Sequence, residues 1–292
     1  MTRYLIVGGD SLIGARLARV LQGKGEVLAT SRRPDRRPQP FLDLASGQTD
    51  AACAVHADVA IVCASITSIQ ACQADPAGTA RVNVTETLRL IERLADAGCF
   101  VIFLSSNAVF DGRSPYPDED AMLSPTIEYG RQKAAVEARI RELAATTRRV
   151  AIVRLSKVVS AQAGMAAEFI RRLRLGVPCP AFADLLLCPA SLGYVCTGLA
   201  AIAATRESGV FHLSGAEEMS YAQFALHLAV QLGVAPSLVI AEDSGRADAG
   251  VVFRPLHPAL GMRRTRRLPG LAPQALESLL GELVAEQGCH AR

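Results

Sequence analysis

The sequence predicts an α/β protein built on a doubly wound parallel sheet. Short apolar runs alternate with longer stretches in which apolar residues recur at helical spacing, and this alternation occurs six times in the first 155 residues. Half of the 292 residues are hydrophobic, 5% are aromatic and none is Trp, which suits helices that pack through Ala, Val and Leu onto a sheet. A chain of this length forms one large domain or two modest ones with a substantial core.

The first strand and the first helix lie within residues 1–22 (MTRYLIVGGDSLIGARLARVLQ). Tyr4–Val7 is an apolar run typical of a buried parallel strand, and from Leu12 onward the apolar residues follow helical spacing. Glycines separate the two elements. A helix that begins directly after such a turn offers an anion site, because its free backbone N–H groups and its dipole point at one spot.

We therefore expect a Rossmann-like pyrophosphate site at this turn, formed by Gly8, Ser11, Leu12, Ile13 and Gly14. Ser11 stands where the commonest fingerprints have glycine, and its hydroxyl either bonds the phosphate or caps the helix. The alternative is a tight turn between strand and helix that binds nothing.

The remaining elements are predicted in chain order, with right-handed crossovers between parallel strands. In the first half we expect strands at 26–30, 41–44, 58–64, 100–104 and 148–155, and helices at 51–57, 79–97 and 127–145. In the second half we expect a strand at 209–213 and helices at 166–175, 194–205, 220–232 and 274–286, with Ser220 as a helix N-cap.

The ends of the strands predict the rest of a dinucleotide site, since ligands lie outside the carboxyl ends of parallel strands. Ser31, Arg32 and Arg33 follow the second strand, where the absence of an acid favours the 2′-phosphate of NADP over the ribose of NAD. A solvated basic loop is the alternative. Asn83, near the start of a helix, either joins the site, caps the helix or faces solvent. The further candidates for cofactor contacts are Asp43, Leu44, Cys63, Ala64, Ser65 and Ser105.

Tyr129 and Lys133 lie four residues apart and therefore on one face of the predicted helix 127–145. A phenol with a pKa near 10 is a poor acid–base catalyst at neutral pH, and an ammonium one helical turn away lowers that pKa. Ser106, at the end of the preceding strand, is placed to share a carbonyl oxygen with the phenol. These groups predict proton transfer coupled to hydride transfer from a nicotinamide. A helix with a surface Lys and a partly buried Tyr is the alternative.

Composition and charge exclude several classes of protein. The formal net charge of +3 is small for this length and argues against nucleic acid as a partner. The eight cysteines show neither a C-x-x-C pair nor zinc spacing, so we expect reduced thiols, no metal site and a cytoplasmic location without a targeting segment. Residues 185–205 carry no charge, but Pro189, Ser191 and Gly193 favour core structure over a membrane span. The basic run 263–267 indicates a solvated face or a phosphate clamp.

These motifs resemble the extended short-chain dehydrogenase/reductase superfamily, and within it the dTDP-4-dehydrorhamnose reductase-like family. The resemblance covers nearly the whole chain, and its most specific part combines VFDG with YGxxK. It implies reduction of a 4-keto group on a nucleotide-linked deoxysugar with NADPH, with Ser106 in the Ser/Thr position, Tyr129 as the acid and Lys133 holding the ribose and tuning Tyr129. The motifs that carry it are GGDSLIG (8–14), LSSNAVFDG (104–112), SPYPDED (114–120), YGRQKAAVE (129–137), VRLSKVV (153–159), GVFHLSG (209–215) and RPLHPAL (254–260).

We therefore expect an NADP-dependent reductase with a dinucleotide-binding domain at 1–155 and a smaller C-terminal α/β region at 156–292 that mainly binds the substrate. About 187–213 of that region is expected to return to the core sheet, and the chain is a candidate homodimer. Two alternatives stay open. One is an epimerase or dehydratase of nucleotide sugars, and the other is a cofactor-binding regulatory subunit without turnover. The replacement of the family's Ser-Thr-Asp-Tyr by Ser105–Ala108 (SSNA) motivates the second of them, and it counts against the first because Asn107 and Ala108 supply no further acid–base group.

Overall fold

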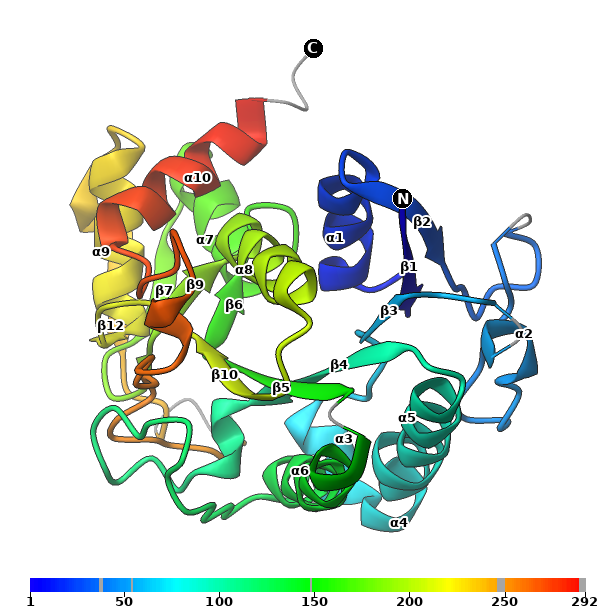
Figure 1. Ribbon diagram of the computed structural model, residues 1–292. Coiled ribbons are helices and arrows are strands. Elements are labelled where there is room, and N and C mark those ends of the chain that lie inside the picture. Colours follow the sequence, from blue (N-terminus) through cyan, green and yellow to red (C-terminus); the bar gives the residue numbers. More distant parts are fainter. Residues whose placement is uncertain (37–38, 54, 148, 246–249, 289–292) are drawn as a thin grey trace.

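The computed structural model describes residues 1–36, 39–53, 55–147, 149–245 and 250–288, and its centre is a six-stranded sheet (Figure 1). Every neighbouring pair in this sheet is parallel, which confirms the predicted fold class. In sheet order the strands are β10 (Gly209–Leu213), β5 (Val150–Leu155), β4 (Phe100–Ser106), β3 (Val59–Val62), β1 (Thr2–Val7) and β2 (Gly25–Ala29).

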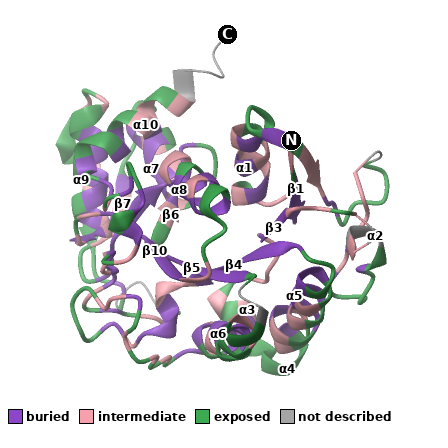
Figure 2. Ribbon diagram, viewed as in Figure 1, coloured by how far each residue is buried: buried purple, intermediate pink, exposed green. Residues whose placement is uncertain are grey.

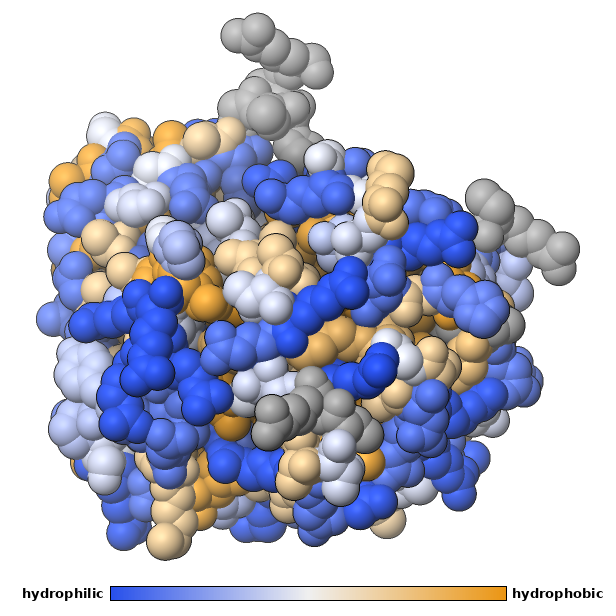
Figure 3. All heavy atoms as spheres, in the orientation of Figure 1, coloured by the Kyte–Doolittle hydropathy of each residue, from blue (hydrophilic) through white to orange (hydrophobic). Residues whose placement is uncertain are grey.

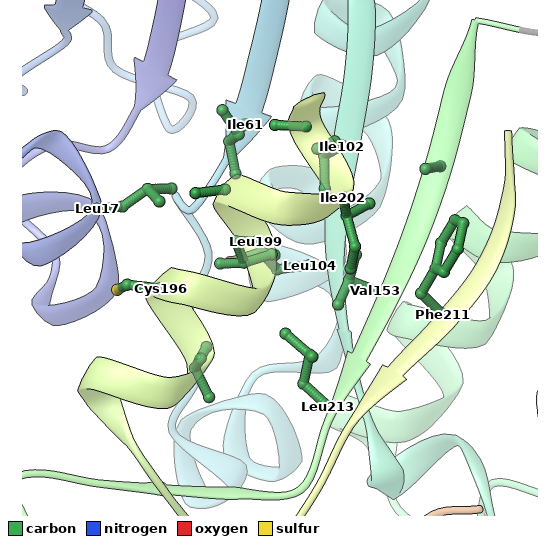
Figure 4. Close-up of a cluster of buried hydrophobic side chains, with 14 of the residues drawn as sticks. Leu17, Ile61, Ile102, Leu104, Val153, Cys196, Leu199, Ile202, Phe211 and Leu213 are labelled. Atoms are coloured by element: carbon green, nitrogen blue, oxygen red, sulfur yellow. The ribbon is translucent and has the colours of Figure 1, made fainter. Parts of the chain in front are cut away.

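Helices cover both faces of the sheet, because successive residues of a strand point to opposite sides. Ile6, Ile61 and Ile102 belong to the core shared with α1 (Leu12–Gln22) and α8 (Leu192–Thr205). Figure 4 shows Leu199 and Ile202 of α8 lying against Ile102 and Val153 of the sheet. The neighbouring residues Leu5, Ala60 and Val101 belong to the opposite core, shared with α5 (Thr87–Asp96) and α6 (Glu128–Thr147).

The uncharged stretch 185–205 is core structure, as predicted. Its last part is α8, whose Val195, Leu199 and Ile202 are fully buried. Of the helices in the described part of the chain, none has the length and apolar character needed to cross a bilayer. On the face of the molecule seen in Figure 3, hydrophilic residues cover most of the surface and hydrophobic ones form small groups between them.

The predicted strand 41–44 is wrong. Phe41 and Asp43 form only isolated bridges, to Ser31 and Gln48, and the sixth strand of the sheet is β10 from the second half of the chain. The apolar alternation in this segment reflects burial instead of pairing, because Leu42 and Leu44 pack into the core beneath the sheet. Pro40 precedes the run and Gly47 follows it, so the segment is too short to extend a ladder.

The predicted helix 79–97 is three consecutive elements. Asp75 caps α4 (Pro76–Ala80), a π-helical turn follows at Arg81–Glu86, and α5 begins at Thr87. π-turns of this kind often occur at functional sites. This one buries Asn83.

The second half forms its own smaller core beside the sheet, seen around α7, α9 and α10 in Figure 1. Figure 2 shows that the inward sides of these helices are buried, as are the central strands. Ser220 caps α9 and forms a capping box with Gln223, which confirms the predicted N-cap. The elements are α7 (Gly164–Arg174), α9 (Tyr221–Gln231), α10 (Leu276–Gly288), β6 (Lys157–Val159), β7 (Cys179–Phe182), β8 (Leu186–Leu187), β9 (Pro189–Ser191), β11 (Met219–Ser220) and β12 (Val239–Glu242).

The first half also contains two short helices, α2 (Asp50–Cys53) and α3 (Ile69–Ala74). The seven cysteines that the structure describes are free thiols. Residue 54 of the predicted helix 51–57, Arg148 of the predicted strand 148–155 and Cys289 lie outside the described residues.

Candidate active site

The turn between β1 and α1 requires glycine at two positions. Gly8 has a φ of 87°, and a Cβ there would lie 2.8 Å from the backbone nitrogen of Ala64. A Cβ on Gly14 would lie 2.3 Å from the carbonyl oxygen of Gly8. The two glycines therefore allow helix α1 to start in direct contact with the ends of β1 and β3.

Ser11 caps α1 and leaves two backbone donors free. Its hydroxyl accepts a hydrogen bond from the Gly14 N–H and donates one to the Gly8 carbonyl oxygen. Of the two alternatives for this hydroxyl, the structure shows the cap. The N–H groups of Leu12 and Ile13 have no acceptor among the described residues. Free donors at a helix N-terminus fit a pyrophosphate, so this turn suits a dinucleotide.

A cavity of about 290 Å³ opens beside this turn, and we call it the turn cavity. It collects predicted residues from four segments that are separated in sequence: Gly8, Ser11, Arg32, Asp43, Leu44, Cys63, Ala64 and Ser65. Sequence reasoning missed five residues of its lining. Asp10 had a signal, since it adjoins Ser11 within the glycine turn, and the other four are Leu42, Ala45, Ile66 and Val82.

Asp10 and Ser31 form a polar pair at the edge of the turn cavity. The Ser31 hydroxyl donates to Asp10 Oδ2 over 2.5 Å, and Arg36 Nη1 lies 3.6 Å from Asp10 Oδ1. Ser31 is buried and also accepts the N–H of Arg33, so it holds the turn after β2 in place. Of the two arginines predicted there, Arg32 lines the cavity and Arg33 does not.

Asn83 holds the segment that forms one wall of the turn cavity. Its side-chain oxygen accepts hydrogen bonds from the Ile66 N–H, at 2.8 Å, and from the Ser65 hydroxyl, at 3.0 Å. Its amide nitrogen donates to the Ile66 carbonyl oxygen and to Gln132 Oε1. Asn83 is buried and lines neither cavity described here, so the structure places it behind the wall.

A second cavity of about 570 Å³ lies next to the first, and we call it the tyrosine cavity. The two share a border, since Ser65 and Ile66 line the turn cavity while Thr67 and Ile69 line the tyrosine cavity. The predicted residues Ser105, Ser106 and Tyr129 line the tyrosine cavity, together with Ile13 of helix α1. The structure thus brings the tip of β4, helix α6 and the glycine turn to one edge of the sheet.

Ser106 ends β4 and begins a 3-10 turn over Asn107–Val109. Its hydroxyl accepts the Ala108 N–H at 3.2 Å and donates weakly to Asn107 Oδ1 at 3.3 Å. Asn107 is anchored in turn, because its amide donates to the Pro258 carbonyl oxygen at 2.8 Å. Ser106 therefore has a fixed position, and its single hydroxyl proton can donate to an acceptor in the cavity only by leaving the weak hydrogen bond to Asn107.

Tyr129 and Lys133 share a helix face as predicted, but their electrostatics differ from the expectation. The protein packed around the Tyr129 ring raises the pKa of its phenol above the ordinary value, so the prediction that Lys133 lowers this pKa is wrong. The Lys133 ammonium lies 5.7 Å from the ring centroid and donates to the Leu104 carbonyl oxygen at 2.9 Å. Burial also lowers the pKa of Lys133 to about 8, so burial shifts both groups toward their neutral forms, while Lys133 still carries its charge at pH 7.

A buried ion pair supports α6 and β4 behind the tyrosine cavity. Glu137, one helical turn after Lys133, contacts Arg154 of β5 with 2.6 Å between Oε2 and Nη2, and neither side chain is exposed. Ser105 donates to Glu137 Oε1 at 2.6 Å, which directs its hydroxyl toward the ion pair. His212 Nε2 lies 3.2 Å from Arg154 Nη1. Burial and the Arg154 charge lower the pKa of His212 to about 3.

Most of the tyrosine cavity comes from residues that sequence reasoning did not select. Five of them follow β3 or β4 in the first half of the chain, and the others end or follow β5, where short elements gave no periodic signal. The motif RPLHPAL (254–260) pointed to Pro255 and Pro258 only as part of a resemblance. The missed residues are Thr67, Ile69, Gln70, Asn107, Ala108, Leu155, Ser156, Lys157, Val158, Phe182, Leu185, Leu186, Leu187, Tyr221, Gly250, Val251, Val252, Phe253, Pro255 and Pro258.

The basic run 263–267 lines neither cavity. Arg263 pairs with Asp118 and Asp120, and the Arg264 N–H donates to the buried Glu119. Within the part of the chain that the structure describes, no cluster of His, Cys, Asp and Glu is arranged to hold a metal ion.

Comparison with known proteins finds one family model over most of the chain and relatives that are named reductases. Residues 2–289 match the family model described as "RmlD substrate binding domain". A dTDP-4-dehydrorhamnose reductase of Sinorhizobium fredii is 29% identical over 70% of this chain and 75% of that protein. A probable low-salt glycan biosynthesis reductase of Haloferax volcanii is 25% identical over 96% of each chain. The crystal structure of a Bacillus anthracis dTDP-4-dehydrorhamnose reductase in complex with NADP has a TM-score of 0.87 and 19% identity, over 98% of this chain and 100% of that chain.

Proposed function

The chain belongs to the family of the RmlD substrate binding domain, as its sequence motifs predicted, and from this premise we propose that it is an NADPH-dependent reductase. Its substrate in this proposal is a ketone on a nucleotide-linked deoxysugar. The names of the relatives support this class, since they are reductases of dTDP-linked keto sugars or of glycan biosynthesis. The observation that carries the proposal is that Tyr129 and Ser106 line one cavity with Ile13, at the border of the turn cavity.

In this proposal the turn cavity holds the adenosine end of the cofactor. The free N–H groups of Leu12 and Ile13 bind the pyrophosphate, and Arg32 pairs with the 2′-phosphate that distinguishes NADP from NAD. Lys133 and Tyr129 lie farther along the same edge of the sheet and would contact the ribose next to the nicotinamide. Residues 1–155 thus supply the cofactor contacts, and residues 156–292 supply most of the substrate contacts.

The chemistry that the cofactor supplies when bound is a hydride for the carbonyl carbon of the substrate. The Tyr129 phenol gives its proton to the carbonyl oxygen as that oxygen takes the electron pair of the broken C=O bond, so ketone becomes alcohol and NADPH becomes NADP⁺. The raised pKa of Tyr129 keeps the phenol protonated at neutral pH, which is the form that reduction needs. An alkoxide is a stronger base than a phenolate, so this proton transfer is favourable. Ser106 donates a hydrogen bond to the same oxygen and orients it.

The test is Tyr129→Phe, assayed by NADPH oxidation with dTDP-4-dehydrorhamnose and with dTDP-4-keto-6-deoxyglucose. Removal of the acid is expected to lower kcat at least about 100-fold, while the Kd for NADPH stays within about 2-fold. Retained turnover in the variant would remove Tyr129 from the mechanism. A wild-type protein that binds NADPH but reduces neither keto sugar would contradict the proposed reaction.

A further inference from the structure

The tyrosine cavity contains one charged side chain in its lining. Apart from Lys157, its described walls are apolar groups, hydroxyls and amides, with no Asp, Glu, Arg or His among them. The chain as a whole has three lysines, and Lys133 and Lys157 are the two near this site. A positive charge that stands alone in a cavity of about 570 Å³ indicates that the ligand brings the opposite charge.

The position of Lys157 is fixed close to the reacting groups. Leu155, the last residue of β5, is in register with Ser106 of β4, and Lys157 follows it by two residues. Lys157 then starts β6, where it pairs in register with Pro189 of β9, and its N–H donates to the Cys188 carbonyl oxygen at 3.1 Å. The backbone on either side of Lys157 is therefore held, and only the long side chain is free to move.

The ammonium group of Lys157 has no ion pair or hydrogen bond with any residue in the described part of the chain. The nearby charges are already paired with each other. Arg254 contacts Asp184 at 3.1 Å, and Glu218 contacts His257 at 3.1 Å. Lys157 is exposed as a residue, but protein around its ammonium group lowers the pKa of Lys157 below the ordinary value, and no ionic partner offsets this effect.

We propose that Lys157 is a specificity-determining residue that pairs with an anionic oxygen group of the substrate, either a phosphate or a carboxylate. This inference rests on the proposed function, since it names the class of molecule that enters beside Tyr129. In the nucleotide-linked case the anion is the diphosphate. In the other case it is an acid group on the sugar, and the cavity then selects acidic sugars over neutral ones. Either anion, the diphosphate or the sugar carboxylate, can pair with the Lys157 ammonium. The carboxylate would place the negative charge nearer to the reacting carbon.

The experiment compares the Kd values of UDP, UDP-glucose and UDP-glucuronate by calorimetry in the wild type and in Lys157→Met, with NADP⁺ at saturation. Lys157→Arg retains the charge, and Lys24→Met makes the same substitution at an exposed lysine outside both cavities. If Lys157 binds the diphosphate, Lys157→Met weakens all three ligands about 10-fold or more. If it binds a sugar carboxylate, only UDP-glucuronate weakens by that factor. In either case Lys157→Arg stays within about 3-fold of the wild type, and Lys24→Met is unchanged.

Equal Kd values in the wild type and Lys157→Met for all three ligands would overturn this inference, and so would a wild-type protein that binds none of them. This result is separate from the test of the proposed function. Loss of turnover in Tyr129→Phe together with unchanged binding in Lys157→Met would leave the reductase in place and remove only Lys157. Absence of turnover in the wild type, together with a 10-fold loss of binding in Lys157→Met, would remove the proposed reductase reaction and leave Lys157 as a ligand-binding residue.

Discussion

The two neighbouring cavities are built in different ways. The turn cavity is lined by residues 8–82, which come from the ends of β1, β2 and β3 and the segments that follow them. The tyrosine cavity draws on residues from Ile13 to Pro258, including the short strands β6 and β8 and the segment before the basic run. A site made from regular strand ends is set by the sheet itself, whereas a site made from distant loops depends on how those loops are supported. The difference predicts where substitutions have the largest effects.

The largest expected effect is on the support behind the tyrosine cavity. Glu137→Gln leaves the Arg154 charge buried without its partner, so the free energy of unfolding should fall by about 3–5 kcal/mol, measured by urea denaturation. Glu168→Gln is the matched control, because Glu168 pairs with Arg171 and Arg172 on the exposed side of α7, where water screens the pair and its loss should lower the free energy of unfolding far less. Equal losses in the two variants would contradict the structural importance of the buried pair.

Lys133→Met tests the buried ammonium beside Tyr129. Lys133 lines neither cavity and donates to the Leu104 carbonyl oxygen. Turnover should fall at least about 100-fold, since Lys133 contacts the cofactor in our proposal. The same change should raise the free energy of unfolding by about 1–2 kcal/mol, because the fold buries the ammonium and lowers its pKa from 10.5 to about 8. Loss of the hydrogen bond to Leu104 offsets part of this gain.

The pH dependence of that gain has a definite sign. Between about pH 8 and 10.5 the unfolded chain holds a proton on Lys133 that the folded protein has released, so wild-type stability rises with pH relative to the variant. The stability difference between Lys133→Met and the wild type should therefore be largest below about pH 8 and shrink above it. A difference that stays constant from pH 7 to about 9.5 would show that burial of the ammonium carries no free-energy cost.

The smallest expected effect is on the turn cavity, where the sheet sets the geometry and one side chain tunes the ligand. Arg32→Ala should weaken NADPH about 10-fold and leave NADH within about 2-fold, so the two affinities converge. Arg33→Ala is the control, because Arg33 follows directly in sequence but does not line the cavity. Equal losses for both variants would indicate a general charge effect on the nucleotide in place of a 2′-phosphate contact.

Much of the fold and of the turn cavity could be predicted from the sequence. Strand ends carry their own signals, as Gly8 and the apolar run before it show, and residues at the carboxyl ends of parallel strands meet at one edge. The failure at 41–44 has a physical reason, because Leu42 and Leu44 alternate as a strand would but are buried by packing alone. Burial and pairing produce the same pattern in a short segment.

The tyrosine cavity was predictable only in its first part. Tyr129, Ser106 and Lys133 carry a local pattern, whereas Phe182, Tyr221 and Val251 come from segments whose meeting point no periodicity specifies. The pKa of Tyr129 was also beyond the sequence, since helical spacing places an ammonium near a phenol but does not reveal that Lys133 is buried or that protein packs around the partly exposed Tyr129 ring. Solvation depends on the tertiary structure, and so does the direction of such a pKa shift.

The sheet strand β10 has a consequence for how the protein is made. Because β10 lies at residues 209–213 and α8 covers one face of the sheet, the core of the first half stays incomplete when residue 155 leaves the ribosome. At about 5–20 residues per second, translation of the missing segment takes roughly 3–12 s. During that interval β10 does not yet pair with the edge of β5, and α8 does not yet cover the apolar side chains around Val153. Chaperone contact is therefore expected to be concentrated in this window of synthesis, and a gene truncated after β5 should yield an aggregating fragment.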